Sequence, residues 1–236
     1  MTRVLKDIIF AICLLSCSNA FAQDTLLNKY GLWVISSVDL YKKTIASNYE
    51  KTMVALSVEI PGVILDLKYA RRDNFMHKKL YPPTTTTYLR LAAAEKLSAV
   101  QGELRQKHLG IKIWDAYRPY SVTEKMWETV KDDRYAADPK VGSGHNRGIA
   151  VDLTLVDLAT NEELDMGTGF DNFSDTAHHD YKKLPEKILL NRLLLRYVME
   201  KWGFKSLESE WWHYYLPDFN KYELLDISFE ELYKIE

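Results

Sequence analysis

Two short stretches of the sequence concentrate residue types that bind metals and move protons. Residues 143–152 include His145 and Asp152, and residues 210–213 include Glu210 and His213. Two imidazoles and a carboxylate suit Zn²⁺, and a catalytic zinc site has three protein ligands and one open position. The sequence therefore predicts one zinc per chain, held by His145, Asp152 and His213. Glu210 is then a spare carboxylate, able to take a proton from the bound water and give one to a departing amine.

The prediction depends on the two stretches meeting in the fold, since a histidine near an aspartate is more often only a hydrogen-bonded pair. Gly144 and Gly148 bracket His145 and suit a sharply turning loop. Glu210 and His213 are three residues apart, so in a straight strand their side chains would face opposite ways. Both can serve one metal only if the backbone bends near Trp211.

Arg118 is a further candidate for chemistry. It ends a predicted strand over residues 111–118 and is followed by Pro119. A guanidinium at that place could stabilise the oxyanion of a tetrahedral intermediate. The competing interpretation is an ordinary surface salt bridge.

The elements that must position these residues mix strands and helices without strict alternation. Strand patterns occur at residues 64–69, 111–118, 152–156 and 210–216. Helices are expected at about 89–107, from Ser121 through 130, and from about 186 to 202; Ser121 and Glu124 form a capping box for the second. This order predicts an α+β fold, a single domain with a largely antiparallel central sheet flanked by helices and a zinc site at the strand ends.

The first residues are typical of an export signal. Arg3 and Lys6 precede the apolar run 8–15, and Ala20-Phe21-Ala22 is a small-x-small cleavage site. We expect cleavage after Ala22 and a periplasmic location, with residues 23–60 as an N-terminal extension and 61–236 as the catalytic domain. The alternative is a lipoprotein anchored at Cys17, because Leu14-Leu15-Ser16-Cys17 resembles a lipoprotein cleavage box.

Removal of 22 residues from the 236 leaves 214, which suits one domain with an ample core and no transmembrane span. Loss of Arg3, Lys6 and Asp7 changes the formal net charge from −2 to −3. Nucleic-acid partners would need a basic excess, so none is expected. Both cysteines, Cys13 and Cys17, lie in the signal, which excludes disulfides and thiolate ligands from the mature chain.

Four motifs extend over most of the mature chain, from about residue 65 to residue 216. They are Trp114-Asp115-Ala116-Tyr117-Arg118-Pro119, Ser143-x-His145-x-Arg147-Gly148-x-Ala150-x-Asp152-Leu153-Thr154-Leu155, Met166-Gly167-Thr168-x-Phe170-Asp171 and Glu210-Trp211-Trp212-His213. Together and in this order they resemble the zinc D-alanyl-D-alanine dipeptidases, a family that includes enzymes of vancomycin resistance. The Glu-Trp-Trp-His block and the spacing of seven between His145 and Asp152 are the most specific features.

The resemblance implies a role for each matching position. His145, Asp152 and His213 match zinc ligands, Glu210 the catalytic base and Arg118 the transition-state arginine. Asp171 matches an acid that holds the substrate ammonium, Tyr69 a tyrosine at that same end, and Ser143 a serine lining the pocket near the substrate carboxylate. Asn146 departs from the pattern, since serine is common at its position.

The activity implied is zinc-dependent hydrolysis of D-alanyl-D-alanine, or a similar D,D-dipeptide, to free amino acids. Resistance enzymes of the family work in the cytoplasm, so an exported chain favours cell-wall peptide turnover or salvage. One alternative is an exported D,D- or L,D-carboxypeptidase that acts on peptidoglycan stem peptides with the same metal site. Another is a non-catalytic module that binds wall peptides or buffers zinc, although such a module would not need Glu210.

Overall fold

The structure is a computed structural model that describes residues 27–133 and 136–235; the predicted signal at 1–22 lies outside them. The α-helices in the described part are α1 (Val38–Ser47), α2 (Leu56–Glu59), α3 (Leu91–Arg105), α4 (Tyr120–Val130), α5 (Glu186–Lys201) and α6 (Phe229–Ile235). The strands there are β1 (Val34–Ile35), β2 (Met53–Ala55), β3 (Ile64–Leu65), β4 (Tyr88–Arg90), β5 (Leu109–Asp115), β6 (Ala150–Asp157), β7 (Lys205–Leu207), β8 (Glu210–Tyr215) and β9 (Leu224–Leu225). None of these helices is long and apolar enough to cross a membrane.

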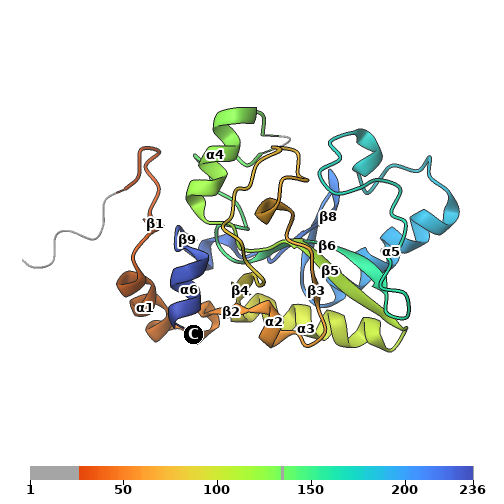
Figure 1. Ribbon diagram of the computed structural model, residues 1–236, viewed down its shortest axis with the longest axis horizontal. Helices are drawn as coiled ribbons and strands as arrows, with labels where there is room; N and C mark the ends of the chain where they lie inside the picture. The colour runs from red at the N-terminus through yellow and green to blue at the C-terminus, as the bar shows by residue number, and fades with distance from the viewer. Residues whose placement is uncertain (1–26, 134–135, 236) are drawn as a thin grey trace, which may run out of the picture.

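A five-stranded sheet in the order β3-β5-β6-β8-β7 forms the centre of the molecule (Figure 1). Its β3–β5 pair is parallel, whereas the β5–β6, β6–β8 and β8–β7 pairs are antiparallel. Two-stranded pairs, β1–β9 and β2–β4, lie beside it. The predicted α+β fold with a largely antiparallel sheet is therefore confirmed.

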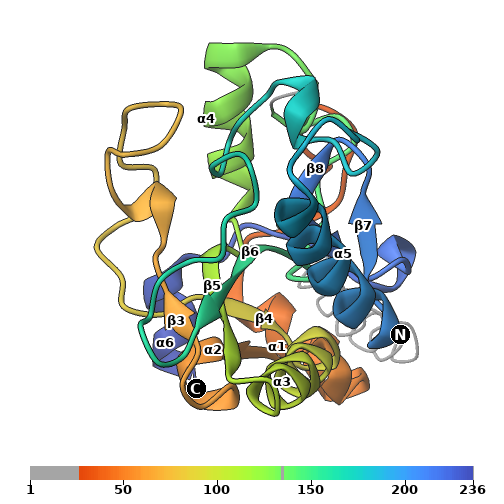
Figure 2. The same cartoon turned by 90° about the vertical axis from the view of Figure 1, so that its right-hand side faces the viewer.

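Helices α3 and α5 pack against the central sheet and against each other, while α4 stands on the opposite side of the molecule from α3 (Figures 1 and 2). The alternating side chains of β6 give the central sheet two different faces, because successive side chains along a strand point to opposite sides. Val151, Leu153 and Leu155 are fully buried in the core that α3 completes. Asp152, between them in sequence, points the other way and lines a pocket. The same strand thus contributes to the core on one face and to the candidate site on the other.

A second buried cluster joins the two ends of the described chain. Ile35 and Tyr41 from the N-terminal segment pack with Leu225, Ile227 and residues of α6. The buried Arg90 ties this region together through backbone carbonyl oxygens, since its guanidinium donates to Arg147 O and Lys51 O. The boundary expected between residues 60 and 61 remains a prediction.

Three details of the expected elements were wrong. The strand predicted at residues 111–118 runs from Leu109 to Asp115, so Arg118 lies beyond its end. The strand predicted at residues 64–69 stops at Leu65 and is followed by a single 3₁₀ turn, Lys68–Ala70. The capping box of Ser121 and Glu124 does not form, because α4 starts one residue earlier, after Pro119. Instead, Asp226 from the C-terminal segment accepts a hydrogen bond from the Ser121 backbone N–H at 2.9 Å. A tertiary contact has replaced the local cap.

Replacing Gly148 with alanine should destabilise the fold by about 1–3 kcal/mol. Gly148 has a φ of +67°, and an added Cβ would lie 2.7 Å from Met53 Sδ. Gly102 is the matched control, since it is exposed on α3 and an added Cβ there meets nothing within 4 Å. Gly102→Ala should stabilise by about 0.5–1 kcal/mol. Denaturant unfolding of both variants measures the two changes in the free energy of unfolding. Equal changes in Gly148→Ala and Gly102→Ala would contradict the predicted crowding at Gly148.

Candidate active site

His145 lies in a tight turn between α4 and β6, and a backbone carbonyl fixes its ring. Its Nδ1 donates to Ala116 O at 2.7 Å, which turns Nε2 towards the pocket. The turn is closed by a hydrogen bond from Gly148 N to His145 O. Arg118 N also donates to His145 O, so the predicted ligand and the predicted oxyanion residue share one backbone contact.

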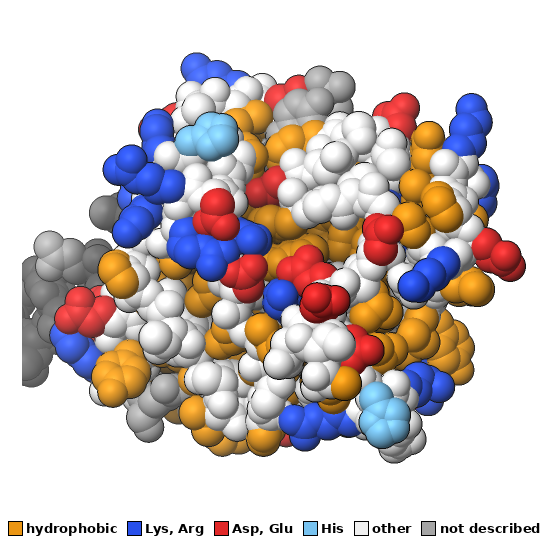
Figure 3. Space-filling model, turned by 45° about the vertical axis from the view of Figure 1, so that its right-hand side comes forward, with side chains coloured by type: hydrophobic (Ala, Val, Ile, Leu, Met, Phe, Trp, Pro, Cys, Tyr) orange, Lys and Arg blue, Asp and Glu red, His pale blue; other side chains and the backbone are white. Residues whose placement is uncertain are grey.

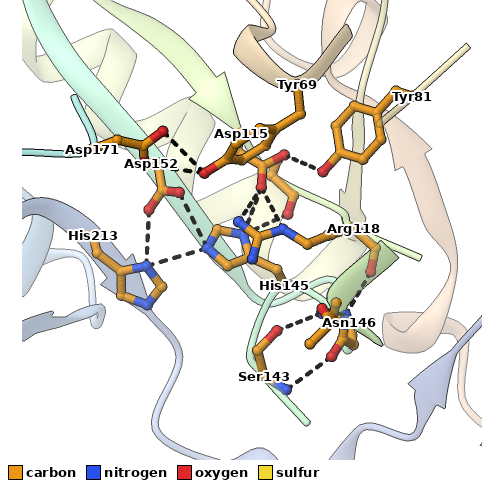
Figure 4. Close-up of polar contacts among 12 residues, drawn as sticks. Tyr69, Tyr81, Asp115, Arg118, Ser143, His145, Asn146, Asp152, Asp171 and His213 are labelled. Carbon is orange, nitrogen blue, oxygen red and sulfur yellow. Dashed lines mark hydrogen bonds and ion pairs between the residues drawn. The ribbon is translucent and has the colours of Figure 1, made fainter. Parts of the chain in front are cut away.

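Asp152 and His213 face each other across the β6–β8 ladder, where they are register partners. Asp152 Oδ1 lies 2.8 Å from His213 Nδ1, and Asp152 Oδ2 lies 3.3 Å from His145 Nε2 (Figure 4). Burial acts to raise the pKa of the Asp152 carboxyl, but the two histidines outweigh it and hold that pKa well below its usual range. Asp152 is therefore a carboxylate ready to bind a cation.

The three predicted ligands fit a zinc ion by the chemistry of their donor atoms. One ligand atom from each of His145, Asp152 and His213 lies within 4.8 Å of the others. His145 Nε2 and His213 Nδ1 are only 3.2 Å apart, so two imidazole nitrogens face each other beside a carboxylate. A cation between them would satisfy all three groups at once, and two nitrogens with one oxygen is a set found in catalytic zinc sites.

Glu210 reaches the same pocket because β8 is irregular. The register against β7 pairs Ser206 with Tyr214 but Leu207 with Glu210, so the ladder shifts between these two pairs. This shift supplies the bend required near Trp211, and Glu210 and His213 both line the pocket. Burial raises the pKa of the Glu210 carboxyl above its ordinary value, which suits a group that must accept and release a proton.

Arg118 is held in place by the buried carboxylate of Asp115. Its Nη2 and Nε donate to Asp115 Oδ2 at 2.7 and 3.0 Å, and Tyr81 OH donates to Oδ1 at 2.7 Å. A register shift in β5 just before Asp115 sets this acid opposite Asp152 on β6. The surface salt-bridge interpretation of Arg118 is wrong, since the residue is 7% exposed and lines the pocket. A buried, paired guanidinium is a fixed positive charge at the site.

Asp171 and Tyr69 meet at another wall of the pocket. Tyr69 OH donates to Asp171 Oδ1 at 3.1 Å, and the Arg118 guanidinium lies 5.1 Å from the Tyr69 ring centroid. Burial raises the pKa of Asp171 to about 8, and the negative charge of Asp152 adds to the effect. Asp171 also has a φ of +56°, a strained conformation for a residue other than glycine. This carboxyl is therefore costly to ionise unless a cation lies beside it.

Ser143 lines the pocket and is tied to Asn146, the residue that departs from the family pattern. Ser143 N donates to Asn146 Oδ1, while Asn146 N donates to Ser143 Oγ. The Asn146 side-chain nitrogen donates to Arg118 O and to Thr123 Oγ1, both at 2.8 Å. The carboxamide thus joins the Ser143 turn to the Arg118 segment (Figure 4).

All eight residues predicted for the site line a single cavity of about 170 Å³. This volume is small beside the roughly 300–1,000 Å³ of pockets for drug-sized ligands, so it suits a small substrate. Figure 3 shows a hollowed face of the molecule, with hydrophobic side chains inside the hollow and acidic side chains around it. The eight residues are Tyr69, Arg118, Ser143, His145, Asp152, Asp171, Glu210 and His213.

Asp115 and Tyr81, which hold Arg118, were not among the residues predicted for the site. The Asp115-x-x-Arg118 spacing was a usable signal for this pair, because an acid and an arginine three apart can meet across a turn. Nothing in the sequence pointed to Tyr81, which comes from a loop between β3 and β4. The other residues that line the cavity are Asp133, Ala136, Ala137, Gly144, Phe173, Leu207 and Trp212.

The Asp171→Asn substitution should stabilise the metal-free protein more at pH 9 than at pH 5. The folded pKa of about 8 lies above the ordinary value of 3.8, so the folded protein binds this proton more tightly than the unfolded chain. The stabilisation that this bound proton gives to the folded protein is complete below about pH 4, and it is lost as the pH rises through about 8. Thermal unfolding checks this, with Asp175→Asn, an exposed acid of the same loop, as the control. An increase in thermal stability of Asp171→Asn that does not depend on pH would contradict the raised pKa of Asp171.

Comparison with known proteins supports the resemblance seen in the motifs. The peptidase M15 family model, described as D-ala-D-ala dipeptidase, matches residues 49–232. A D-alanyl-D-alanine dipeptidase of Escherichia coli (strain K12) is 38% identical over 180 residues, covering 75% of this chain and 91% of the relative. Another, of Streptomyces coelicolor (strain ATCC BAA-471 / A3(2) / M145), is 33% identical over 181 residues, covering 67% and 88%.

Among solved structures, the LdcB LD-carboxypeptidase aligns with a TM-score of 0.41 and 17% identity, over 84% of this chain and 90% of that one. This likeness is too distant to bear on activity. The family match covers most of the chain, and the relatives are matched over nearly their full length. The chain therefore belongs to the D-ala-D-ala dipeptidase family of peptidases, and its predicted class, a dipeptidase, is confirmed.

Proposed function

We propose that this protein hydrolyses D-alanyl-D-alanine, or a closely similar D,D-dipeptide, with one Zn²⁺ per chain. The observation that carries the proposal is the convergence of all eight predicted residues on one small cavity. A cavity of about 170 Å³ favours a dipeptide over a longer peptide. The D-alanyl-D-alanine dipeptidases that the chain resembles support the choice of substrate.

The metal ligands in this proposal are His145, Asp152 and His213. When bound there, zinc would polarise the amide carbonyl and lower the pKa of the attacking water towards roughly 7. Glu210 accepts the proton of that water and later donates a proton to the leaving amide nitrogen. The raised pKa of Glu210 supports this role, because a proton held too weakly could not be returned to the nitrogen.

Arg118 stabilises the oxyanion that forms when the carbonyl is attacked. Its guanidinium is fixed by Asp115 before the reaction starts, so little reorganisation is needed as the negative charge develops. Such a contact is stronger in the transition state than with the neutral amide, so it lowers the reaction barrier rather than merely binding substrate.

Asp171 and Tyr69 bind the free ammonium of the substrate, and Ser143 lies near its carboxylate. An ammonium beside Asp171 would lower the raised pKa of that carboxyl and so compensate for its burial. Because Asp171 lines this part of the cavity, we expect its demand for a charged amino terminus to limit the length of the substrate. A stem peptide offers an amide at that point instead.

We propose that the enzyme acts outside the cytoplasm, where it takes part in cell-wall peptide turnover or salvage. Its support is the N-terminal sequence, with Arg3 and Lys6 before an apolar run and a small-x-small site ending at Ala22. Cleavage there would release a soluble periplasmic protein with an extension at 23–60 and a catalytic domain at 61–236. Lipidation at Cys17 would anchor it instead.

Glu210→Gln should abolish turnover while the protein keeps its zinc, because Glu210 acts on protons and is not a ligand. General base catalysis contributes on the order of 10²–10⁴-fold, so kcat should fall by at least that much. His213→Ala is the contrasting variant and should lose the metal. Zinc analysis and dipeptide assays of both, with the exposed Glu208→Gln as a control, check the assignment. Loss of zinc from Glu210→Gln would make Glu210 a ligand and contradict it.

Acetylation of the substrate amino group should reduce kcat/KM by roughly 10²-fold or more, because it leaves the partly buried Asp171 without a cationic partner. The measurement compares D-Ala-D-Ala with N-acetyl-D-Ala-D-Ala. Asp171→Asn should slow hydrolysis of the free dipeptide and narrow the gap between the two substrates. Equal kcat/KM for both in the unmutated enzyme would overturn the dipeptide specificity and favour the carboxypeptidase alternative.

A further inference from the structure

Arg192 is a buried arginine of α5 whose bonding is unlike that of a surface ion pair. It is 4% exposed, and within the described residues its guanidinium donates to three backbone carbonyl oxygens and to no carboxylate. Nε donates to Met166 O at 2.7 Å, Nη2 to Thr176 O at 2.9 Å and Nη1 to His178 O at 3.1 Å. A buried charge is tolerated only when its hydrogen bonds are satisfied, so these three contacts are strong constraints on the carbonyls.

The three carbonyls lie at the two ends of one segment, residues 166–178, which we name the Asp171 loop. One guanidinium therefore closes the base of the loop, joining its first residue to its last ones. The loop leaves the central sheet after β6 and returns to α5, passing the pocket where Asp171 meets Tyr69. A second contact comes from β8, where Trp211 Nε1 donates to Thr168 Oγ1 at 2.7 Å.

The conformation of the loop needs such restraint. Asp171 has a positive φ of 56°, and its partly buried carboxyl has a pKa raised to about 8. Both features cost free energy locally, so they persist only where surrounding contacts fix the backbone. The Arg192 guanidinium also lies 5.8 Å from the Trp211 ring, next in sequence to Glu210. Arg192 thus contacts both the Asp171 loop and the strand that carries the proposed base.

We propose that Arg192 is a positioning residue that fixes the Asp171 loop and thereby closes the ammonium end of the substrate pocket. The inference rests on the proposed function, because that function assigns the substrate ammonium to Asp171. The three hydrogen bonds from Arg192 to backbone carbonyls explain how the loop is held. Arg192 touches no reacting atom. Its effect is on how well Asp171 is placed, and so on substrate binding and on the preference for a free amino terminus.

The test is Arg192→Lys, which keeps the positive charge but lacks the planar fork that reaches both ends of the loop. Arg196→Lys is the matched control, since Arg196 lies one turn later on α5 and, among the described residues, forms ion pairs with Glu200 and Glu208 alone. Arg192→Lys should raise KM for D-Ala-D-Ala about tenfold or more, with a smaller change in kcat. It should also reduce the ratio of kcat/KM for D-Ala-D-Ala to kcat/KM for N-acetyl-D-Ala-D-Ala. Amide hydrogen exchange at residues 167–177 should speed up about tenfold, with β6 and β8 unchanged. The control should change none of these.

Unchanged KM and exchange in Arg192→Lys would overturn the inference. So would faster exchange throughout β6 and β8 with loss of zinc, because that would show a general structural role. If the unmutated enzyme fails to distinguish free from acetylated dipeptide, the proposed function fails, and amide exchange in the Asp171 loop alone then tests the inference about Arg192.

If the Arg192→Lys variant does not fold, hydrogen exchange in the unmutated enzyme tests the inference instead. The Arg192 Nε proton and the loop amides should then exchange with the same denaturant dependence, and a protected Nε proton beside freely exchanging amides would overturn the inference.

Discussion

Negative charge concentrated in a small buried space is the constraint on which the rest of the site depends. Asp115, Asp152, Asp171 and Glu210 all place carboxyl groups in or beside one cavity, and buried carboxylates are costly without positive partners. Asp115 has Arg118 as its partner, and Asp152 has the two histidines with the metal they would bind. Burial raises the pKa of Asp115, Asp171 and Glu210, but of these three only Asp115 has an ion-pair partner among the described residues. The two carboxyl groups without such a partner are the ones to which the proposed function assigns an ammonium and a mobile proton.

The fold meets this constraint by placing charged groups side by side on the central sheet. Asp115, Asp152 and His213 are register partners on β5, β6 and β8, so three adjacent strands fix their relative positions. Irregularities in β5 and β8 then adjust single side chains, setting Asp115 opposite Asp152 and bringing Glu210 to the pocket that holds His213. Loops supply the rest, as the His145 turn and the Asp171 loop do. Strands thus hold two of the three proposed metal ligands, Asp152 and His213, and a turn holds the third, His145. A loop held at its base carries Asp171, the residue that would select the substrate.

The sequence predicted which residues meet in one cavity, because metal and acid–base chemistry would require particular residue types at short spacings. His145 with Asp152, and Glu210 with His213, were recognisable from such spacings, as was the need for a bend near Trp211. Long-range contacts were not predictable. Tyr81 and Arg192 act through partners many residues away, and the cap of α4 comes from Asp226 rather than from the local Ser121 and Glu124. Strand ends were also misplaced, since Leu65 and Asp115 end strands whose residue patterns continue beyond them.

The central claim is that His145, Asp152 and His213 form one metal site that Glu210 faces without binding. Anomalous diffraction at the zinc edge from crystals of the zinc-loaded protein tests it most directly, because the anomalous signal locates the metal independently of any assumed ligand. We predict one strong peak per chain among His145 Nε2, His213 Nδ1 and the Asp152 carboxylate, with the Glu210 carboxylate outside bonding distance. A peak elsewhere, or zinc bound by Glu210 in place of one of the three, would contradict it.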